Sequence, residues 1–216
     1  MRQLSYSPEE NQNLLRRRVD ELRESLRKKD PSKLADNTGM IYTPGEREQG
    51  LFEFQFWGRE TCLTFPALVA TDHQSGKELG AASQALLMYY FHTADGYIGS
   101  GQWISFSELP DGRFYNQAFQ GYTGREIAKK FKNDILDFEK AAQAAGGSKY
   151  PHGDKAYIFK MLPRISLLTV YWQGDEDFPS SAQILFGAEV NHYLPTDACA
   201  IAGSMLTRRL VSYNGS

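Results

Sequence analysis

Residues 155–186, KAYIFKMLPRISLLTVYWQGDEDFPSSAQILF, decide the fold of this chain. KAYIFKML (155–162) alternates in polarity, which is typical of a strand with one solvated face. ISLLTVYW (165–172) is continuously apolar, which predicts a strand that is buried on both faces. AQILF (182–186) offers this strand a neighbour. Together these runs predict a sheet of mostly antiparallel strands.

The rest of the chain adds further strands and about three helices. LFEFQFW (51–57) alternates and can turn at Gly58 and Arg59 into TCLTF (61–65), which is the spacing of a hairpin. Helices are expected in the segments 80–96, 123–146 and 195–211. The sequence therefore predicts an α+β fold, in which residues 34–216 form a single domain around a mixed, mostly antiparallel sheet.

An N-terminal helical arm is expected over residues 1–33. Ser7 is the predicted N-cap, Pro8 takes the first helical position, and the helix runs to about Lys29. Acidic residues lie among the basic ones and can pair with them along the helix, so we interpret its basic face as a solvated surface. One apolar seam lies on the helix, formed by Leu15, Val19, Leu22 and Leu26. The seam can dock on the domain's own core or join two copies into a homo-oligomer, and the sequence leaves both uses open.

Composition excludes several classes of protein. The formal net charge is -2, so no overall field draws the chain onto nucleic acid or an anionic membrane. Cys62 and Cys199 are far apart in sequence and lie in apolar settings, which favours reduced, buried thiols over a disulfide. The N-terminal residues MRQLSYSPEENQNLL contain no apolar run of signal-peptide length, and no stretch of 18 apolar residues occurs in the sequence, so we expect a cytoplasmic protein.

Common catalytic and metal-binding motifs are missing from the sequence. There is no Walker A loop, no nucleophile elbow and no HExxH, which removes several large enzyme classes. None of the four histidines has a second histidine or cysteine two to four residues further on. Zinc would therefore have to be assembled from scattered positions, and no metal site is predicted.

The three consecutive acids Asp175, Glu176 and Asp177 follow the buried strand. They begin like a calcium loop, but the fifth and sixth positions of that loop are Pro179 and Ser180, where an oxygen ligand and a glycine are required. We therefore interpret the segment as a solvated turn between two strands, with the acids pointing outward.

Two aromatic residues, Trp172 and Phe178, are expected to anchor this turn. The basic surface of a partner protein is the favoured recipient of the acids. A metal-assisted enzyme that uses the three acids, with His192 assisting, is the alternative.

Four segments together resemble one known family: 101–115 (GQWISFSELPDGRFY), 144–147 (AAGG), 162–186 and 192–197 (HYLPTD). The family is catalogued as a domain of unknown function, DUF 3786, of anaerobic bacteria and archaea, and is sometimes fused to an iron-sulfur segment similar to that of a corrinoid protein. The resemblance implies a setting in anaerobic redox or one-carbon metabolism. The four-cysteine segment is missing here, so no iron-sulfur cluster is expected. Gly187 stands where the family pattern suggests an Asp.

We therefore expect a non-catalytic binding or accessory domain, whose ligand is a small molecule such as a tetrapyrrole or a partner protein. Aromatic and cationic side chains suited to such a site are Trp103, Arg113, Phe114, Tyr115 and Trp172, with the 175–177 acids and His192 as further candidates. The metal-assisted enzyme and a homo-oligomeric scaffold joined by the N-terminal helix are the alternatives.

Overall fold

The computed structural model describes residues 8–47 and 49–214, with side chains from residue 16 onward. The chain divides into two compact units: unit 1 comprises Met1–Phe54 and Glu60–Gly96, and unit 2 comprises Gln55–Arg59 and Tyr97–Ser216. The expected α+β class is confirmed, with the strands divided between two sheets. The predicted N-cap Ser7 and the side chain of Leu15 lie outside the described residues. The expected division into an arm of residues 1–33 and a single domain of residues 34–216 stays a prediction.

Unit 1 contains a sheet of order β1-β2-β3-β4 together with three helices. Its elements are α1 (Pro8–Leu26), α2 (Pro31–Thr38), β1 (Ile41–Pro44), β2 (Gly50–Phe56), β3 (Arg59–Phe65), β4 (Ala70–Asp72) and α3 (Ala81–Thr93). The predicted alternation of β2 is confirmed, because Phe52, Phe54 and Phe56 are all buried. Phe52 packs edge-on against Phe91 of α3, with ring centroids 4.9 Å apart. This aromatic contact joins the sheet to α3.

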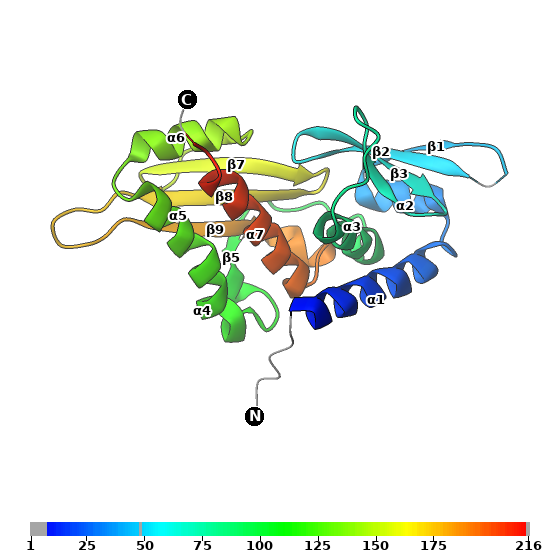
Figure 1. Cartoon of the computed structure of the whole chain (residues 1–216), viewed down its shortest axis with the longest axis horizontal. Coiled ribbons are helices and arrows are strands. Elements are labelled where there is room, and N and C mark those ends of the chain that lie inside the picture. The colour runs from blue at the N-terminus through cyan, green and yellow to red at the C-terminus, as the bar shows by residue number, and fades with distance from the viewer. Residues whose placement is uncertain (1–7, 48, 215–216) are drawn as a thin grey trace. The chain divides into compact units, whose positions relative to one another are not determined.

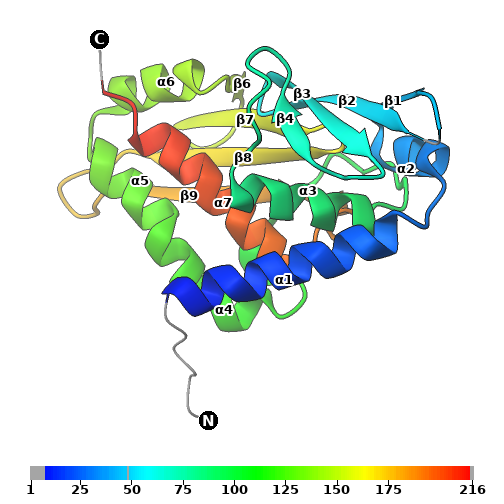
Figure 2. The same cartoon turned by 45° about the vertical axis from the view of Figure 1, so that its right-hand side comes forward.

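Helix α1 uses its apolar seam within unit 1. Val19, Leu22 and Leu26 are buried, and α1 lies beside α3 (Figures 1 and 2). The guanidinium of Arg23 also donates to the carbonyl oxygen of Leu68 over 3.1 Å. Of the two uses expected for the seam, the structure favours docking on the chain's own core.

Unit 2 is built on a sheet of order β5-β9-β8-β7-β6, in which neighbouring strands run antiparallel. Its strands are β5 (Trp103–Ser105), β6 (Ser148–Tyr150), β7 (Lys155–Leu162), β8 (Ile165–Trp172) and β9 (Ser181–Gly187). Its helices are η1 (Phe106–Glu108), α4 (Gly112–Tyr122), α5 (Gly124–Phe131), α6 (Ile135–Ala144), η2 (Ala188–His192) and α7 (Thr196–Val211). None of the helices in the described ranges 8–47 and 49–214 has the length and apolarity needed to cross a bilayer.

The α-helices of unit 2 cover one face of this sheet (Figures 1 and 2). On that face the ring of Phe138 from α6 stacks on Tyr171 of β8, with centroids 4.7 Å apart, and meets Tyr157 of β7 at 6.0 Å. Because side chains alternate along a strand, Val170 of β8 and Ala156 of β7 point to the opposite face. Both residues are also buried, so β8 is covered on both sides as its sequence predicts.

Candidate functional site

The face of the unit 2 sheet that points away from α6 is called the open face here. Strand register places Tyr150, Ala156, Val170 and Gln183 in one row across it. The next row contains Ile158, Leu168 and Leu185. Ala156, Leu168 and Val170 are buried, and partly buried apolar side chains pack around them. The open face is therefore a second, smaller apolar cluster on the sheet.

Three aromatic side chains form the rim of this cluster. Trp103 lies on the edge strand β5, Tyr150 on the opposite edge strand β6, and Trp172 at the end of β8. Trp103 and Tyr150 nevertheless meet edge to face, with centroids 5.9 Å apart. All three are partly buried and keep part of their rings accessible. The sequence names Trp103 and Trp172 as candidates for one site, and both pack against the same apolar cluster.

The turn between β6 and β7 lies against Trp172. A Cβ atom at Gly153 would meet Val170 Cγ1 at 2.6 Å and Trp172 Nε1 at 3.1 Å, and φ here is +55°. Both the close approach and the left-handed backbone therefore require glycine. The backbone N–H of Gln173 donates to Asp154 Oδ2 over 2.8 Å, which ties the turn to the end of β8.

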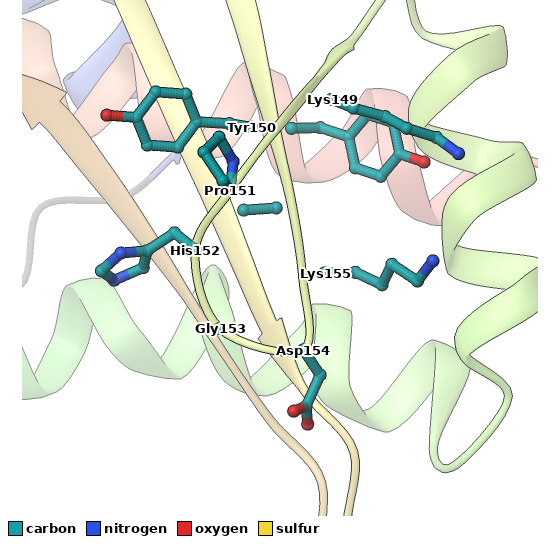
Figure 3. A pocket seen from close by; sticks show the side chains of 9 residues that line it. Lys149, Tyr150, Pro151, His152, Gly153, Asp154 and Lys155 are labelled. Carbon is teal, nitrogen blue, oxygen red and sulfur yellow. The ribbon is translucent and has the colours of Figure 1, made fainter.

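A shallow pocket of about 710 Å³ is formed by residues 149–157 around this turn. Figure 3 shows that Tyr150 and His152 project to one side of the turn, while Lys149 and Lys155 project to the other. His152 is exposed, so its imidazole stands free of the apolar cluster at the turn. The pocket thus combines an aromatic wall with a histidine.

The two lysines of the pocket are held by Glu139 of α6. Glu139 forms ion pairs with Lys149 and Lys155 and accepts a hydrogen bond of 2.9 Å from the hydroxyl of Tyr157. These three hydrogen bonds lower the pKa of Glu139 from 4.5 to about 2, and the bond from Lys149 makes the largest contribution. These cations therefore stabilise the helix-covered side of the sheet.

The acidic segment 175–177 forms the turn that the sequence predicts. Asp175 Oδ1 accepts hydrogen bonds from the backbone N–H groups of Asp177 and Phe178, over 2.9 and 2.8 Å. Asp175, Glu176 and Asp177 are all exposed. Within the described ranges, these acids belong to no group of three or more residues with metal-binding geometry.

The prediction that Phe178 anchors this turn is wrong. Its side chain is 71% exposed. The turn is held instead by Asp175 and by Gly174, whose N–H donates to Asn133 Oδ1 over 3.1 Å. A Cβ at Gly174 would meet the backbone N of Ser180 at 2.5 Å, so the segment closes too tightly for a larger residue. Trp172, the other expected anchor, packs into the open-face cluster.

The remaining predicted residues lie elsewhere in unit 2. Arg113 and Tyr115 are exposed on α4, and Phe114 between them is 85% exposed. Because α4 belongs to the helix layer, these residues are separated from the open face by the sheet. The imidazole of His192 stacks on the ring of Tyr97, with centroids 4.0 Å apart. The structure therefore does not gather all the predicted residues into one site.

Sequence reasoning missed Tyr150 and His152 and also Glu189. Residues 148–150 form a strand of three residues, too short to show alternation.

Glu189 Oε2 is buried without a hydrogen-bond partner among the described residues. It lies only 2.4 Å from the position that a Cβ atom on Gly99 would take. The other carboxylate oxygen, Oε1, lies 2.3 Å from the position of a Cβ atom on Gly187. Since Gly187 pairs with Trp103, this carboxylate lies beside the strand that carries Trp103.

Glycine at position 187 also has a physical role. The family resemblance suggests an Asp there, but a Cβ at Gly187 would lie 2.3 Å from Glu189 Oε1, so any larger residue requires the Glu189 side chain to move. An acid at 187 would also place two carboxylates next to each other, which repel one another.

Of three comparisons with known proteins, only the one with family profiles finds a match. Neither the curated proteins nor the solved structures contain a match to this chain. A family profile described as "Domain of unknown function (DUF3786)" matches residues 30–209, which include the complete unit 2 sheet and its rim of Trp103, Tyr150 and Trp172. This match covers most of the chain, and the protein therefore belongs to the DUF3786 family.

Proposed function

We propose that unit 2 is a non-catalytic binding module whose open face takes a flat, largely apolar ring. The observation that carries the proposal is the rim of three partly buried aromatics, Trp103, Tyr150 and Trp172, around a buried aliphatic patch. Ring faces and edges of this kind favour stacked and edge-to-face contacts with another aromatic ring. The partly buried Ile158 and Leu185, which pack around the same patch, add apolar surface that a ligand could bury.

A tetrapyrrole is the ring system to test first. The resemblance to proteins of anaerobes, some of them fused to corrinoid-type segments, motivates this choice. His152 supports it, because an exposed imidazole beside Tyr150 can ligate the metal at the centre of such a ring. The lysines of the same turn are engaged by Glu139, whereas the imidazole of His152 is exposed on the side of Tyr150.

The test is titration of the anaerobically purified protein with haem and, separately, with cobalamin. The chain has three tryptophans, two of which belong to the rim, so quenching of tryptophan fluorescence reports binding together with the visible spectrum of the ring. Trp103→Ala and Trp172→Ala should each weaken binding by about tenfold, because each removes one stacking surface. Tyr115→Ala is the matched control, since Tyr115 is an exposed aromatic on α4.

His152→Ala separates ligation from stacking. If His152 ligates the metal, this substitution changes the visible spectrum of the bound ring while binding is retained. Failure of both rings to bind, or binding that is equally strong in both tryptophan variants, would contradict the proposed function.

A further inference from the structure

Three side chains with metal-binding chemistry converge in unit 1, far from any sequence motif. They are Glu53 of β2, Cys62 of β3 and His73, which follows β4. One ligand atom from each lies within 4.8 Å of the other two. Cys62 Sγ and His73 Nδ1 are 3.1 Å apart. The sequence predicts only a buried thiol at Cys62 and no metal site, because these residues are 9 and 11 positions apart along the chain.

Strand register explains why they meet. Trp57 and Gly58 form the β2–β3 turn, with φ of 53° and 74°, the backbone of a two-residue hairpin. Counting back from this turn places Glu53 opposite Cys62. Cys62 pairs in turn with Thr71 of β4, and Glu53 with Ile41 of β1. These four residues form one row on the outer face of the unit 1 sheet, opposite the face that carries Phe52.

His73 lies on the same face, two residues beyond Thr71 of this row. Its backbone N–H donates to the carbonyl oxygen of Glu60 over 3.0 Å, which continues the β3–β4 pairing. The loop that follows is closed by Asp72, whose Oδ1 accepts from both the N–H and the hydroxyl of Ser75 over 2.8 Å. The imidazole is therefore carried by a backbone that is fixed on both sides, diagonally across from Cys62.

We propose that Glu53, Cys62 and His73 bind a divalent cation of the zinc class, with a fourth coordination position open to water or a small ligand. Thiolate, imidazole and carboxylate are the three side-chain types that bind zinc, and three protein ligands with one open position is the arrangement of reactive zinc sites. Around a tetrahedral zinc ion, the sulfur and nitrogen ligands lie about 3.6 Å apart and nitrogen and oxygen about 3.3 Å. The observed separations need only small side-chain shifts to reach these values.

The environment favours a cation over a nucleophilic thiol. Burial raises the pKa of Cys62, and the negative charges of Glu53 and Glu60 raise it further. An activated catalytic thiol needs the opposite, a depressed pKa. A bound cation reverses the balance, because it holds the thiolate directly and is itself attracted by both carboxylates. His73 is exposed, so an ion has a route to the site from solvent.

The test uses cobalt(II) as a spectroscopic probe on the full-length, tag-free chain under reducing conditions. One equivalent should produce a thiolate-to-cobalt charge-transfer band, and zinc should abolish it by displacement. Cys62→Ser should eliminate the band. Glu53→Gln and His73→Asn should weaken binding by at least about tenfold, the loss typical even of residues that only support a ligand. Two matched controls, His92→Asn and Glu126→Gln, lie outside the cluster and should bind as the wild type does.

A second measurement removes the dependence on variants that must fold. Zinc should protect Cys62 of the wild type from alkylation, read peptide by peptide by mass spectrometry, with Cys199 as the internal reference. Protection of Cys62 with loss of the band in Cys62→Ser would support the site. No band at one equivalent, a band that persists without Cys62, or alkylation of Cys62 that zinc does not slow would overturn it.

Discussion

The open face of the unit 2 sheet and the outer face of the unit 1 sheet are both made of alternating side chains on antiparallel strands, yet they carry different chemistry. The open face buries Leu168 and Val170 under partly exposed aromatics. The outer face sets Cys62 against a carboxylate and an imidazole, with Ile41 in the same row left 68% exposed. One face is suited to an extended apolar surface and the other to a point charge. The comparison teaches that the same strand geometry supplies either kind of site, depending on which residues fall in register.

The largest expected difference between the two faces is in stability. Leu168→Ala should lower the free energy of unfolding by about 2–5 kcal/mol, because it leaves a cavity beneath the aromatic rim. Ile41→Ala, in the exposed row of unit 1, should change it by about 0.5 kcal/mol or less. Urea unfolding followed by tryptophan fluorescence measures both. Equal losses would show that the open-face cluster contributes no core.

The next prediction compares two glycines with similar backbone conformations. Gly153 has φ +55° and Gly76 has φ +65°. Substitution by alanine should cost about 1–2 kcal/mol at each, for the left-handed backbone. At Gly153 the new Cβ would also collide with Val170 Cγ1, whereas nothing lies within 4 Å of it at Gly76. Gly153→Ala should therefore destabilise more in urea titrations and should also weaken ring binding, and a larger loss for Gly76→Ala would contradict this account of the turn.

How far the sequence predicts these features depends on how local they are. Alternation of apolar and polar residues predicts β2 and β7, and a continuous apolar run predicts β8, because the order of residues within each strand reflects which of its faces are buried. Helix α4 was not predicted, since GRFYNQAFQGY begins and nearly ends with glycine and buries only Gly112 and Phe119. Trp103 and Trp172 were named as candidates from their residue type. Their closeness to Tyr150 could not be predicted, because it requires the order of the five strands.

The unit 1 cluster shows the same limit more sharply. The Glu53 and Cys62 pairing follows from a two-residue turn and could be counted from the sequence. His73 could not be placed, because its position depends on the pairing of β3 with β4 across the loop 66–69, which begins at Pro66. Metal-site searches based on short spacings therefore pass over ligands that a sheet brings together from separate strands.

A third prediction compares the two thiols in a metal-free protein. Cys62 is 8% exposed at a sheet face, and Cys199 is fully buried in α7. Burial raises the pKa of Cys199 strongly, with a smaller contribution from Asp197. With chelator present, iodoacetamide should therefore label Cys62 at least about tenfold faster than Cys199, which opens only when unit 2 unfolds. Labelling rates by peptide mass spectrometry decide this, and faster labelling of Cys199 would contradict the predicted accessibility of the cluster.

The smallest expected effect is a pH dependence that belongs to unit 2. Lys149, Tyr157 and Lys155 hold the folded-state pKa of Glu139 at about 2, below its ordinary value of 4.5. A lowered carboxyl pKa contributes stability that is fully present above about pH 4.5 and is lost as pH falls toward about 2. Glu139→Gln should thus lower the urea midpoint slightly at neutral pH, because Lys149 is 66% exposed and solvent screens the pair. The gap between the variant and the wild type should close as the solution is acidified through this window, whereas the exposed control Glu126→Gln should show no such closure. A gap that stays constant with pH would mean that Glu139 acts through packing and not through its charge.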